Sequence, residues 1–411
     1  MIEYPKLRPV EAIPAQDNLI CLRDPLGYSD QLVFLPLEAL FVVSLFDGRH
    51  SVLDVQAEFT RRFGTILLSE KVQEIIRKLD ECLLLESERF QEARRRALEA
   101  FRSAAKRPAS HAGGAYEAEP DALRRQLQEL FEGSGGSTSP SSPAVSEGVL
   151  RGLIAPHIDL RRGGGCFARS YAELERGSRA ETFVVLGIAH VPTCRRFALC
   201  AKDFETPLGV LPVDRDFLQS LDGRLQRDFY EDEFVHRSEH SVEFQAVFLQ
   251  FLYGGLKPVR FVPILCSGFE KAAVSGLPEE EPEFREFVEA LRLTLAESRS
   301  SACCIAAVDL SHLGRRFGQE VTLGRAFLEQ AEADDRRMIE RILAGDAEGF
   351  LRLIQEERDC RNVCGVPAIY TLLRLLEGQV SGRAGRLLSY EQAVEDSAQS
   401  VVTFMGAAFY S

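Results

Sequence analysis

Histidines that follow apolar, strand-like runs are the residues of this sequence best suited to chemistry. His157 comes directly after the run 153–156, and His190 comes directly after the run 184–189. Side chains just outside the carboxyl ends of strands in an open α/β sheet meet in one crevice, so the two imidazoles are expected to lie close together. A third run ends in Asp309-Leu310-Ser311-His312, which adds a carboxylate and an imidazole. Three strands delivering such side chains to one edge indicate a site rather than packing.

Two further residues each have a structural and a chemical interpretation. His240 lies in the segment Glu239-His240-Ser241-Val242-Glu243, which opens a helical pattern whose apolar face includes Phe244. It either caps that buried face or faces the crevice beside the other histidines. Cys364 precedes Gly365 and a helical run. A thiolate at a helix N-terminus is expected to have a lowered pKa and to suit a soft or borderline metal ion. A small core residue fits the same spacing, which leaves both interpretations open.

The elements that must position these residues follow an alternating pattern. Apolar runs at 149–155, 183–188, 259–265 and 305–308 predict strands, and helical patterns lie near 121–132, 167–176, 241–253, 283–297, 320–344 and 365–377. Continuous apolar strands that alternate with helices are typical of a mainly parallel sheet with helices on both faces. The predicted fold class is therefore α/β.

The first 90 residues show a different pattern and predict a small winged-helix-like α domain. A short strand at 32–35 precedes helices at 37–46, after Ser51 and from near Ser69 onward. Residues 91–108 are predicted to form a charged helical connector, and residues 109–411 the second domain. The Gly/Ser-rich stretch 133–146 is expected to be a flexible loop inside that second domain.

Composition excludes several classes of function. The formal net charge of −13 argues against a nucleic-acid binder, because phosphate contacts need a surplus of Lys and Arg. No uncharged apolar run is long enough to span a bilayer, and residues 1–5 lack the features of a secretory signal. The ten cysteines show no paired framework, which favours reduced thiols. A cytoplasmic protein is expected.

Residues from about 109 to 411 resemble the Memo family, which includes the proteins called AmmeMemoRadiSam system protein B. The resemblance rests on six ordered segments and on a closing stretch from Asp396 to Ala408; the segments are 111–116, Ala155-Pro156-His157, 186–190, 239–243, 309–312 and Cys364-Gly365. It implies a fold similar to LigB-type class III extradiol dioxygenases, which use non-haem Fe(II). It also implies that His157, His190 and Cys364 are metal ligands, and that His240, Asp309 and His312 line the same cavity as catalytic groups.

This sequence departs from the family's pattern at two places. Ile158-Asp159-Leu160 follows the Ala-Pro-His segment where the family usually has Ala-Gly-Tyr, so Asp159 is expected to add a charge near the metal. Val366-Pro367-Ala368 after Cys364-Gly365 also differs. The identity of the substrate therefore cannot be carried over from the family, whereas the ligands can.

The N-terminal domain resembles PqqD-type peptide-binding domains through residues 46–52 and the helices after them. This resemblance implies docking of a peptide or of a radical-SAM partner enzyme. A module that serves only packing or dimerisation fits the same residues.

Three functions remain open for the metal site. The first is a redox enzyme with Fe(II), in which His240 or His312 acts as acid or base and Asp309 orients a histidine. The second is a non-catalytic adaptor that holds a metal. The third is a zinc hydrolase, because two imidazoles and a thiolate also suit catalytic zinc. Copper is a further possible ion.

Overall fold

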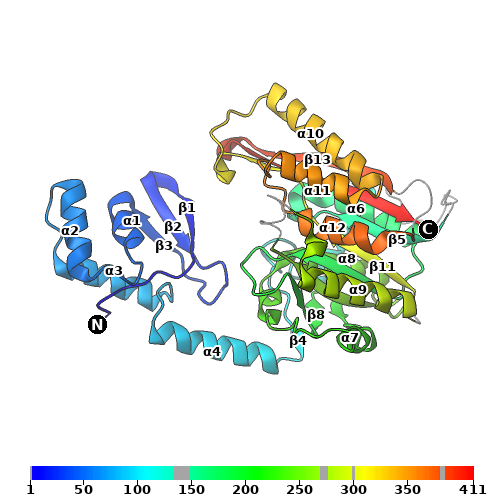
Figure 1. Cartoon of the computed structure of the whole chain (residues 1–411), viewed down its shortest axis with the longest axis horizontal. Coiled ribbons are helices and arrows are strands. Elements are labelled where there is room, and N and C mark those ends of the chain that lie inside the picture. The colour runs from blue at the N-terminus through cyan, green and yellow to red at the C-terminus, as the bar shows by residue number, and fades with distance from the viewer. Residues whose placement is uncertain (1, 134–147, 269–275, 299–300, 380–384) are drawn as a thin grey trace. The chain divides into compact units, whose positions relative to one another are not determined.

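A computed structural model describes residues 2–133, 148–268, 276–298, 301–379 and 385–411 (Figure 1). The chain divides into two compact units, Met1–Ala104 and Ala105–Ser411. The loop predicted at 133–146 lies outside the described residues except for Gly133, which ends helix α5 (Pro120–Gly133). None of the described helices is long and apolar enough to cross a membrane.

The first unit combines a small antiparallel sheet with helices. Its sheet has the order β1-β2-β3. The strands are β1 (Glu11–Pro14), β2 (Leu19–Arg23) and β3 (Val33–Pro36), and the helices are α1 (Leu37–Ser44), α2 (Val52–Phe63), α3 (Ser69–Glu81) and α4 (Glu88–Ser103). Ser51 caps α2, and its side chain accepts a hydrogen bond from the backbone N–H of Asp54. The structure adds β1 and β2 to the predicted elements.

The end of α4 and the start of the second unit occupy the segment predicted as a connector. α4 ends at Ser103 within the first unit, and β4 (Lys106–Arg107) pairs with β8 (Asp203–Thr206) in the second. β9 (Gly209–Leu211) completes this small sheet.

The second unit is built on a sheet with the order β12-β14-β5-β11-β6-β10-β7, and β13 pairs with β14. The strands are β5 (Leu150–Ala155), β6 (Thr182–Ile188), β7 (Phe197–Leu199), β10 (Arg260–Cys266), β11 (Ala302–Ala307), β12 (His312–Gly314), β13 (Gly385–Glu395) and β14 (Ser400–Tyr410). The four central strands β5, β11, β6 and β10 are parallel. Their carboxyl ends therefore lie at one edge.

Helices cover both faces of this sheet, as Figure 1 shows, which confirms the predicted fold class. They are α5, α6 (Leu160–Gly177), α7 (Arg215–Asp222), α8 (His240–Tyr253), α9 (Pro282–Glu297), α10 (Arg325–Leu343), α11 (Ala347–Glu356) and α12 (Val366–Leu376). Short 3-10 helices lie at Gln16–Asn18, Glu233–Arg237, Pro278–Glu280, Arg315–Phe317 and Asp396–Ala398.

Two glycines show how closely helices approach the two faces. A Cβ atom at Gly187 in β6 would lie 2.6 Å from Ser241 and Val242 of α8, and one at Gly152 in β5 would lie 2.6 Å from Leu376 of α12. At Gly187 the neighbouring Ser241 and Val242 side chains are short and leave no room for a Cβ atom, whereas at Gly152 the flexible Leu376 side chain would have to shift. Close contact at Gly187 brings the N-terminal turn of α8, which carries His240, against the strand that precedes His190.

Candidate metal centre

Three parallel strands deliver one candidate residue each to the same edge of the sheet. His157, His190 and Asp309 all lie two residues after the ends of their strands, β5, β6 and β11. The ring centroids of His157 and His190 are 4.9 Å apart. The prediction that the two imidazoles meet at this edge therefore agrees with the geometry.

Cys364 approaches the same two histidines from the loop before α12. Its Sγ lies 3.4 Å from Nε2 of His157. One ligand atom each from His157, His190 and Cys364 lie within 4.8 Å of one another. In a tetrahedral site, N and S donors at about 2.0 and 2.3 Å from one ion are separated by about 3.5 Å. The donor types and their separation therefore fit a single metal ion.

The hydrogen bonds of His157 leave its Nε2 available as a ligand. Its Nδ1–H donates to the backbone carbonyl of Ala307 at 2.9 Å, which sets the tautomer. Burial, together with the charges that His190 and His240 can carry, lowers the pKa of His157 well below its usual value. His157 is therefore neutral at physiological pH, which is the form that binds metals.

Glu239 is the residue of this site that sequence reasoning missed. It is buried, and its carboxylate oxygens lie 3.0 and 3.1 Å from Nδ1 of His190 and 3.1 Å from Nδ1 of His240. Burial alone would raise the pKa of Glu239, but the two imidazoles hold it well below its usual value. A carboxylate that orients a ligand histidine is common beside metal ions. Its position directly before His240 was the signal in the sequence.

The predicted low pKa of Cys364 is wrong for the chain without a cation. Cys364 does lie at a helix start, one residue before Gly365, the N-cap of α12. Burial and the nearby carboxylate of Asp309 nevertheless raise the pKa of its thiol well above the usual value. The helix dipole is a partial charge, and here it does not offset desolvation. A bound cation would reverse this balance.

Asp309 is a buried carboxylate that contacts both the backbone and the imidazole of His157. Its Oδ1 accepts hydrogen bonds from the N–H groups of His157 and Ile158, at 3.0 and 3.2 Å. Its Oδ2 lies 3.7 Å from Nε2 of His157. Burial raises the pKa of Asp309 to about 6. The group therefore both fixes the loop that carries His157 and can exchange a proton near neutral pH.

The structure brings His240 into the cluster and places His312 differently. The ring of His240 lies 4.7 Å from that of His190 and 5.3 Å from that of His157, so His240 faces the crevice. His312 belongs to neither group of described residues whose ligand atoms converge. Its ring contacts Phe317, and burial lowers its pKa to about 4.

A buried ion pair supports the start of α8. Arg107 and Glu243 are both fully buried and form a salt bridge. Arg107 also donates hydrogen bonds to the backbone carbonyls of His236 and Glu239, each at 2.8 Å. Glu243 also accepts a hydrogen bond from the hydroxyl group of Tyr116. This network holds the turn from which Glu239 and His240 project.

Asp159, expected to add charge near the metal, has a structural role. Its carboxylate caps α6 by accepting the N–H groups of Arg161 and Arg162. It also pairs with the Arg162 side chain at 2.6 Å. These contacts account for both oxygens of Asp159.

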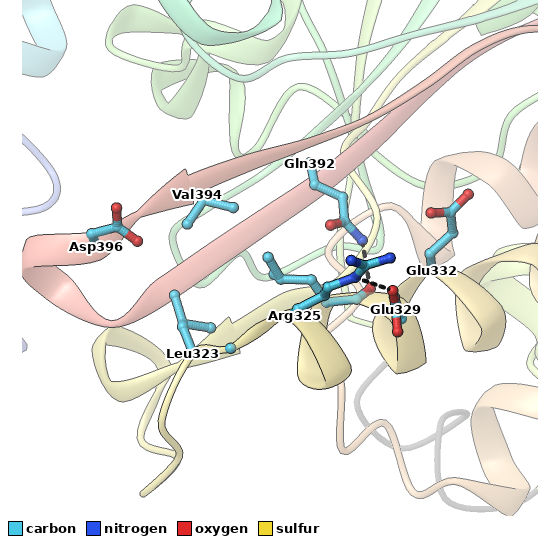
Figure 2. Close-up of a pocket in the computed structure, with 9 residues that line it drawn as sticks. Leu323, Arg325, Glu329, Glu332, Gln392, Val394 and Asp396 are labelled. Carbon is cyan, nitrogen blue, oxygen red and sulfur yellow. Dashed lines mark hydrogen bonds and ion pairs between the residues drawn. The ribbon is translucent and has the colours of Figure 1, made fainter.

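Two pockets differ in their relation to this centre. A pocket of about 580 Å³ is lined by His190 and Cys364 among others and lies directly beside the ligands. A second pocket, of about 350 Å³, lies between α10 and β13 (Figure 2). Arg325 and Glu329, which are one turn apart in α10, form an ion pair at 2.7 Å along one side of it, and none of the candidate residues lines it. The first pocket is therefore the one that could place a molecule near the candidate metal ligands His190 and Cys364.

Comparison with known proteins gives one consistent family. The sequence profile of the Memo-like protein family matches residues 107–408. A MEMO1 family protein of Aquifex aeolicus is 29% identical over 406 residues, which cover 99% of this chain and 100% of the relative. A MEMO1 family protein of Thermus thermophilus is 28% identical over 87% of this chain and 98% of its own length. One of Methanopyrus kandleri is 29% identical over 68% of this chain and 89% of its own length.

Proposed function

The chain belongs to the Memo-like family, and we propose that it binds one divalent metal ion through His157, His190 and Cys364. We further propose that the ion is Fe(II) and that the protein is a redox enzyme resembling extradiol dioxygenases. The observation that carries the proposal is the convergence of the three ligand atoms within 4.8 Å. These atoms come from three separate loops of the second unit.

The donor set leaves coordination positions open. Two imidazoles and one thiolate are fewer ligands than iron or zinc usually takes, and the adjoining pocket of about 580 Å³ gives a second molecule room. When bound, a ferrous ion would supply coordination positions for a substrate and O2 and would supply electrons. Zinc and copper suit the same donors, and a zinc ion would favour hydrolysis instead.

The surrounding side chains would orient the ligands and move protons. Glu239 would hold Nδ1 of both His190 and His240, which leaves their Nε2 atoms for the metal and for a proton, respectively. Asp309, whose pKa burial raises to about 6, would accept or release a proton beside His157. A nearby cation would lower this pKa and favour the ionised carboxylate, which would then be a weaker base.

For His312 the proposal is an accessory role. Because burial lowers its pKa to about 4, His312 is uncharged at neutral pH and is a weak base. Its backbone N–H donates to the carbonyl of Arg361 at 2.8 Å, in the loop that leads to Cys364. It would therefore act through this loop.

For the first unit we propose docking of a peptide or of a radical-SAM partner enzyme. β3 is an edge strand of its sheet, and Phe34 in that strand is 47% exposed. Leu32 and Leu37, which flank the strand, are also exposed. An edge strand with exposed apolar side chains can pair with an extended segment of another chain.

Metal analysis combined with oxygen uptake tests the enzymatic proposal. The full chain, reconstituted anaerobically with Fe(II), should hold about one iron per chain and consume O2 with a catechol substrate. A His157→Ala, Cys364→Ala double variant should do neither. Wild-type protein that retains no iron would contradict the proposed ion. Iron retention without oxygen uptake would favour the adaptor function.

A further inference from the structure

The pocket beside the proposed metal ligands has a mostly apolar wall. Alongside His190 and Cys364, it is lined by apolar residues that include Ala189, Val191, Pro192, Val363 and Val366. The volume of about 580 Å³ is in the range of small-molecule sites. A molecule bound there would lie against His190 and Cys364, two of the three proposed ligands. The polar groups of the wall would decide which molecules bind.

Asp359 supplies a carboxylate to this wall. Its Oδ1 accepts the backbone N–H of Val363 at 2.9 Å. Within the described part of the chain, Oδ2 has no hydrogen-bond donor. Burial raises the pKa of Asp359, although the Val363 N–H and the charge of Arg361 oppose this. The carboxylate therefore has capacity for another donor.

His190 is the one titratable base among the described residues that line the pocket, and it pairs with Glu239. Among the described residues that line the pocket, none is Lys or Arg. Arg361, two residues away, is directed elsewhere and forms ion pairs with Asp335 at 2.6 Å and with Glu357 at 2.7 Å. An anionic group placed near Asp359 would be repelled, whereas an ammonium group would form a charge-assisted hydrogen bond.

The loop that presents Asp359 is held in an unusual conformation. Arg358, Asp359 and Asn362 have φ values of 52°, 47° and 49°, in the left-handed region that residues other than Gly, Asn and Asp seldom adopt, so Arg358 is the unusual one. The buried pair of Arg361 with Asp335 ties this loop to α10. Such strain persists where the surrounding structure imposes it, and it concentrates at functional sites.

We propose that Asp359 determines specificity by binding a cationic amine of a small substrate whose apolar body occupies the pocket beside Cys364 and His190. The role of this molecule as substrate rests on the proposed function. The preference for a positive charge is independent of the proposed function, because it arises from Asp359 and the apolar wall alone.

Three probes of similar size and different charge test this preference: 2-phenylethylamine, 2-phenylethanol and phenylacetate. Their binding to the full chain, treated with EDTA to remove metal, is measured by ligand-observed NMR titration. The amine should bind about tenfold more tightly than the alcohol, and phenylacetate should bind most weakly. Asp359→Asn should abolish the advantage of the amine and leave binding of the alcohol unchanged, because the amide oxygen can still accept the Val363 N–H.

Glu356→Gln is the matched control, since it removes an exposed negative charge in the preceding helix and should preserve the preference. Equal binding of amine and alcohol, tighter binding of phenylacetate, or a preference that survives Asp359→Asn would overturn the proposal. So would a lack of binding by all three probes at millimolar concentration. The comparison of the probes on the wild-type chain holds even if Asp359→Asn fails to fold. Because metal is absent, the result is independent of whether the chain binds iron.

Discussion

Nε2 of His157 lies 3.4 Å from Sγ of Cys364, although the two residues are 207 positions apart in the chain. His157 reaches this point from the end of β5, and Cys364 from the loop before α12. The Nδ1–H of His157 is bound to the Ala307 carbonyl, so the lone pair of Nε2 faces the thiol. This contact defines the centre on which the following predictions rest.

Removal of the thiol should abolish tight metal binding. Cys364→Ser is expected to weaken binding of Zn²⁺ or Fe²⁺ by at least about 100-fold, because a hydroxyl is a poor replacement for a thiolate. Competition with a chromophoric chelator measures the affinity. Cys360→Ser, which changes an exposed cysteine of the same loop, should bind metal like the wild type. Equal affinities for the two variants would exclude Cys364 as a ligand.

Loss of the charge on Glu239 should weaken the centre without removing a proposed ligand. Glu239→Gln can orient His190 and His240 less well, and a fall in metal affinity of about 10- to 100-fold is expected. Glu231→Gln, at an exposed carboxylate paired with Arg195, serves as the control. Isothermal titration with Zn²⁺ compares the variants. An unchanged affinity of Glu239→Gln would show that this carboxylate does not support the ligands.

Metal affinity should rise with pH through the neutral range. Burial and Asp309 raise the pKa of the Cys364 thiol, so a proton must leave before the thiolate can bind a cation. Affinity is therefore expected to increase about tenfold per pH unit below that pKa. His157 adds nothing to this slope near neutrality, since its pKa lies well below the usual value. Chelator competition at several pH values gives the slope, and a flat profile would mean that no thiol proton is displaced.

The buried pair of Arg107 and Glu243 should be important for stability. Arg107→Met leaves a buried carboxylate without its cation, for which a loss of about 3–5 kcal/mol is expected. Arg96→Met breaks an exposed pair with Glu92 and should change stability little. Urea unfolding followed by circular dichroism provides the comparison. The account of this network fails if both variants unfold at the same urea concentration.

His236 should make the fold sensitive to acid. Its Nε2–H donates to the Ala198 carbonyl, and burial lowers its pKa from 6.5 to about 4. Between these two pH values His236 binds a proton in the unfolded chain but not in the folded chain. Stability is thus lost as pH falls from about 6.5 to about 4, by about 3 kcal/mol in total from this group.

His236→Gln retains a donor for Ala198 and cannot titrate. As pH falls from about 6.5 to about 4, the wild type should therefore lose more unfolding free energy than this variant does. A difference that is independent of pH would contradict the assigned pKa.

Much of the second unit could be predicted because its signals are local. Continuous apolar runs identify β5, β6, β10 and β11, and parallel strands necessarily bring the residues after them to one edge. That reasoning placed His157, His190 and Asp309 together. The antiparallel strand β13 has no such signal, because its residues are only partly buried along its length.

The remainder depends on burial and on long-range contacts that spacing does not encode. A helix start next to Cys364 suggested a low pKa, but desolvation decides the opposite sign. Glu239 can orient His190 only because the loop after β6 brings the two residues together, although they are 49 positions apart in the sequence. The cap that Asp159 forms on α6 was likewise not indicated by its position after the Ala-Pro-His segment.

X-ray absorption spectroscopy of the zinc-loaded protein tests the central claim most directly. One sulfur at about 2.3 Å and two imidazole nitrogens at about 2.0–2.1 Å should surround each ion. In Cys364→Ser the sulfur shell should disappear. A wild-type spectrum without any sulfur neighbour would show that the ion, if bound, is held somewhere else.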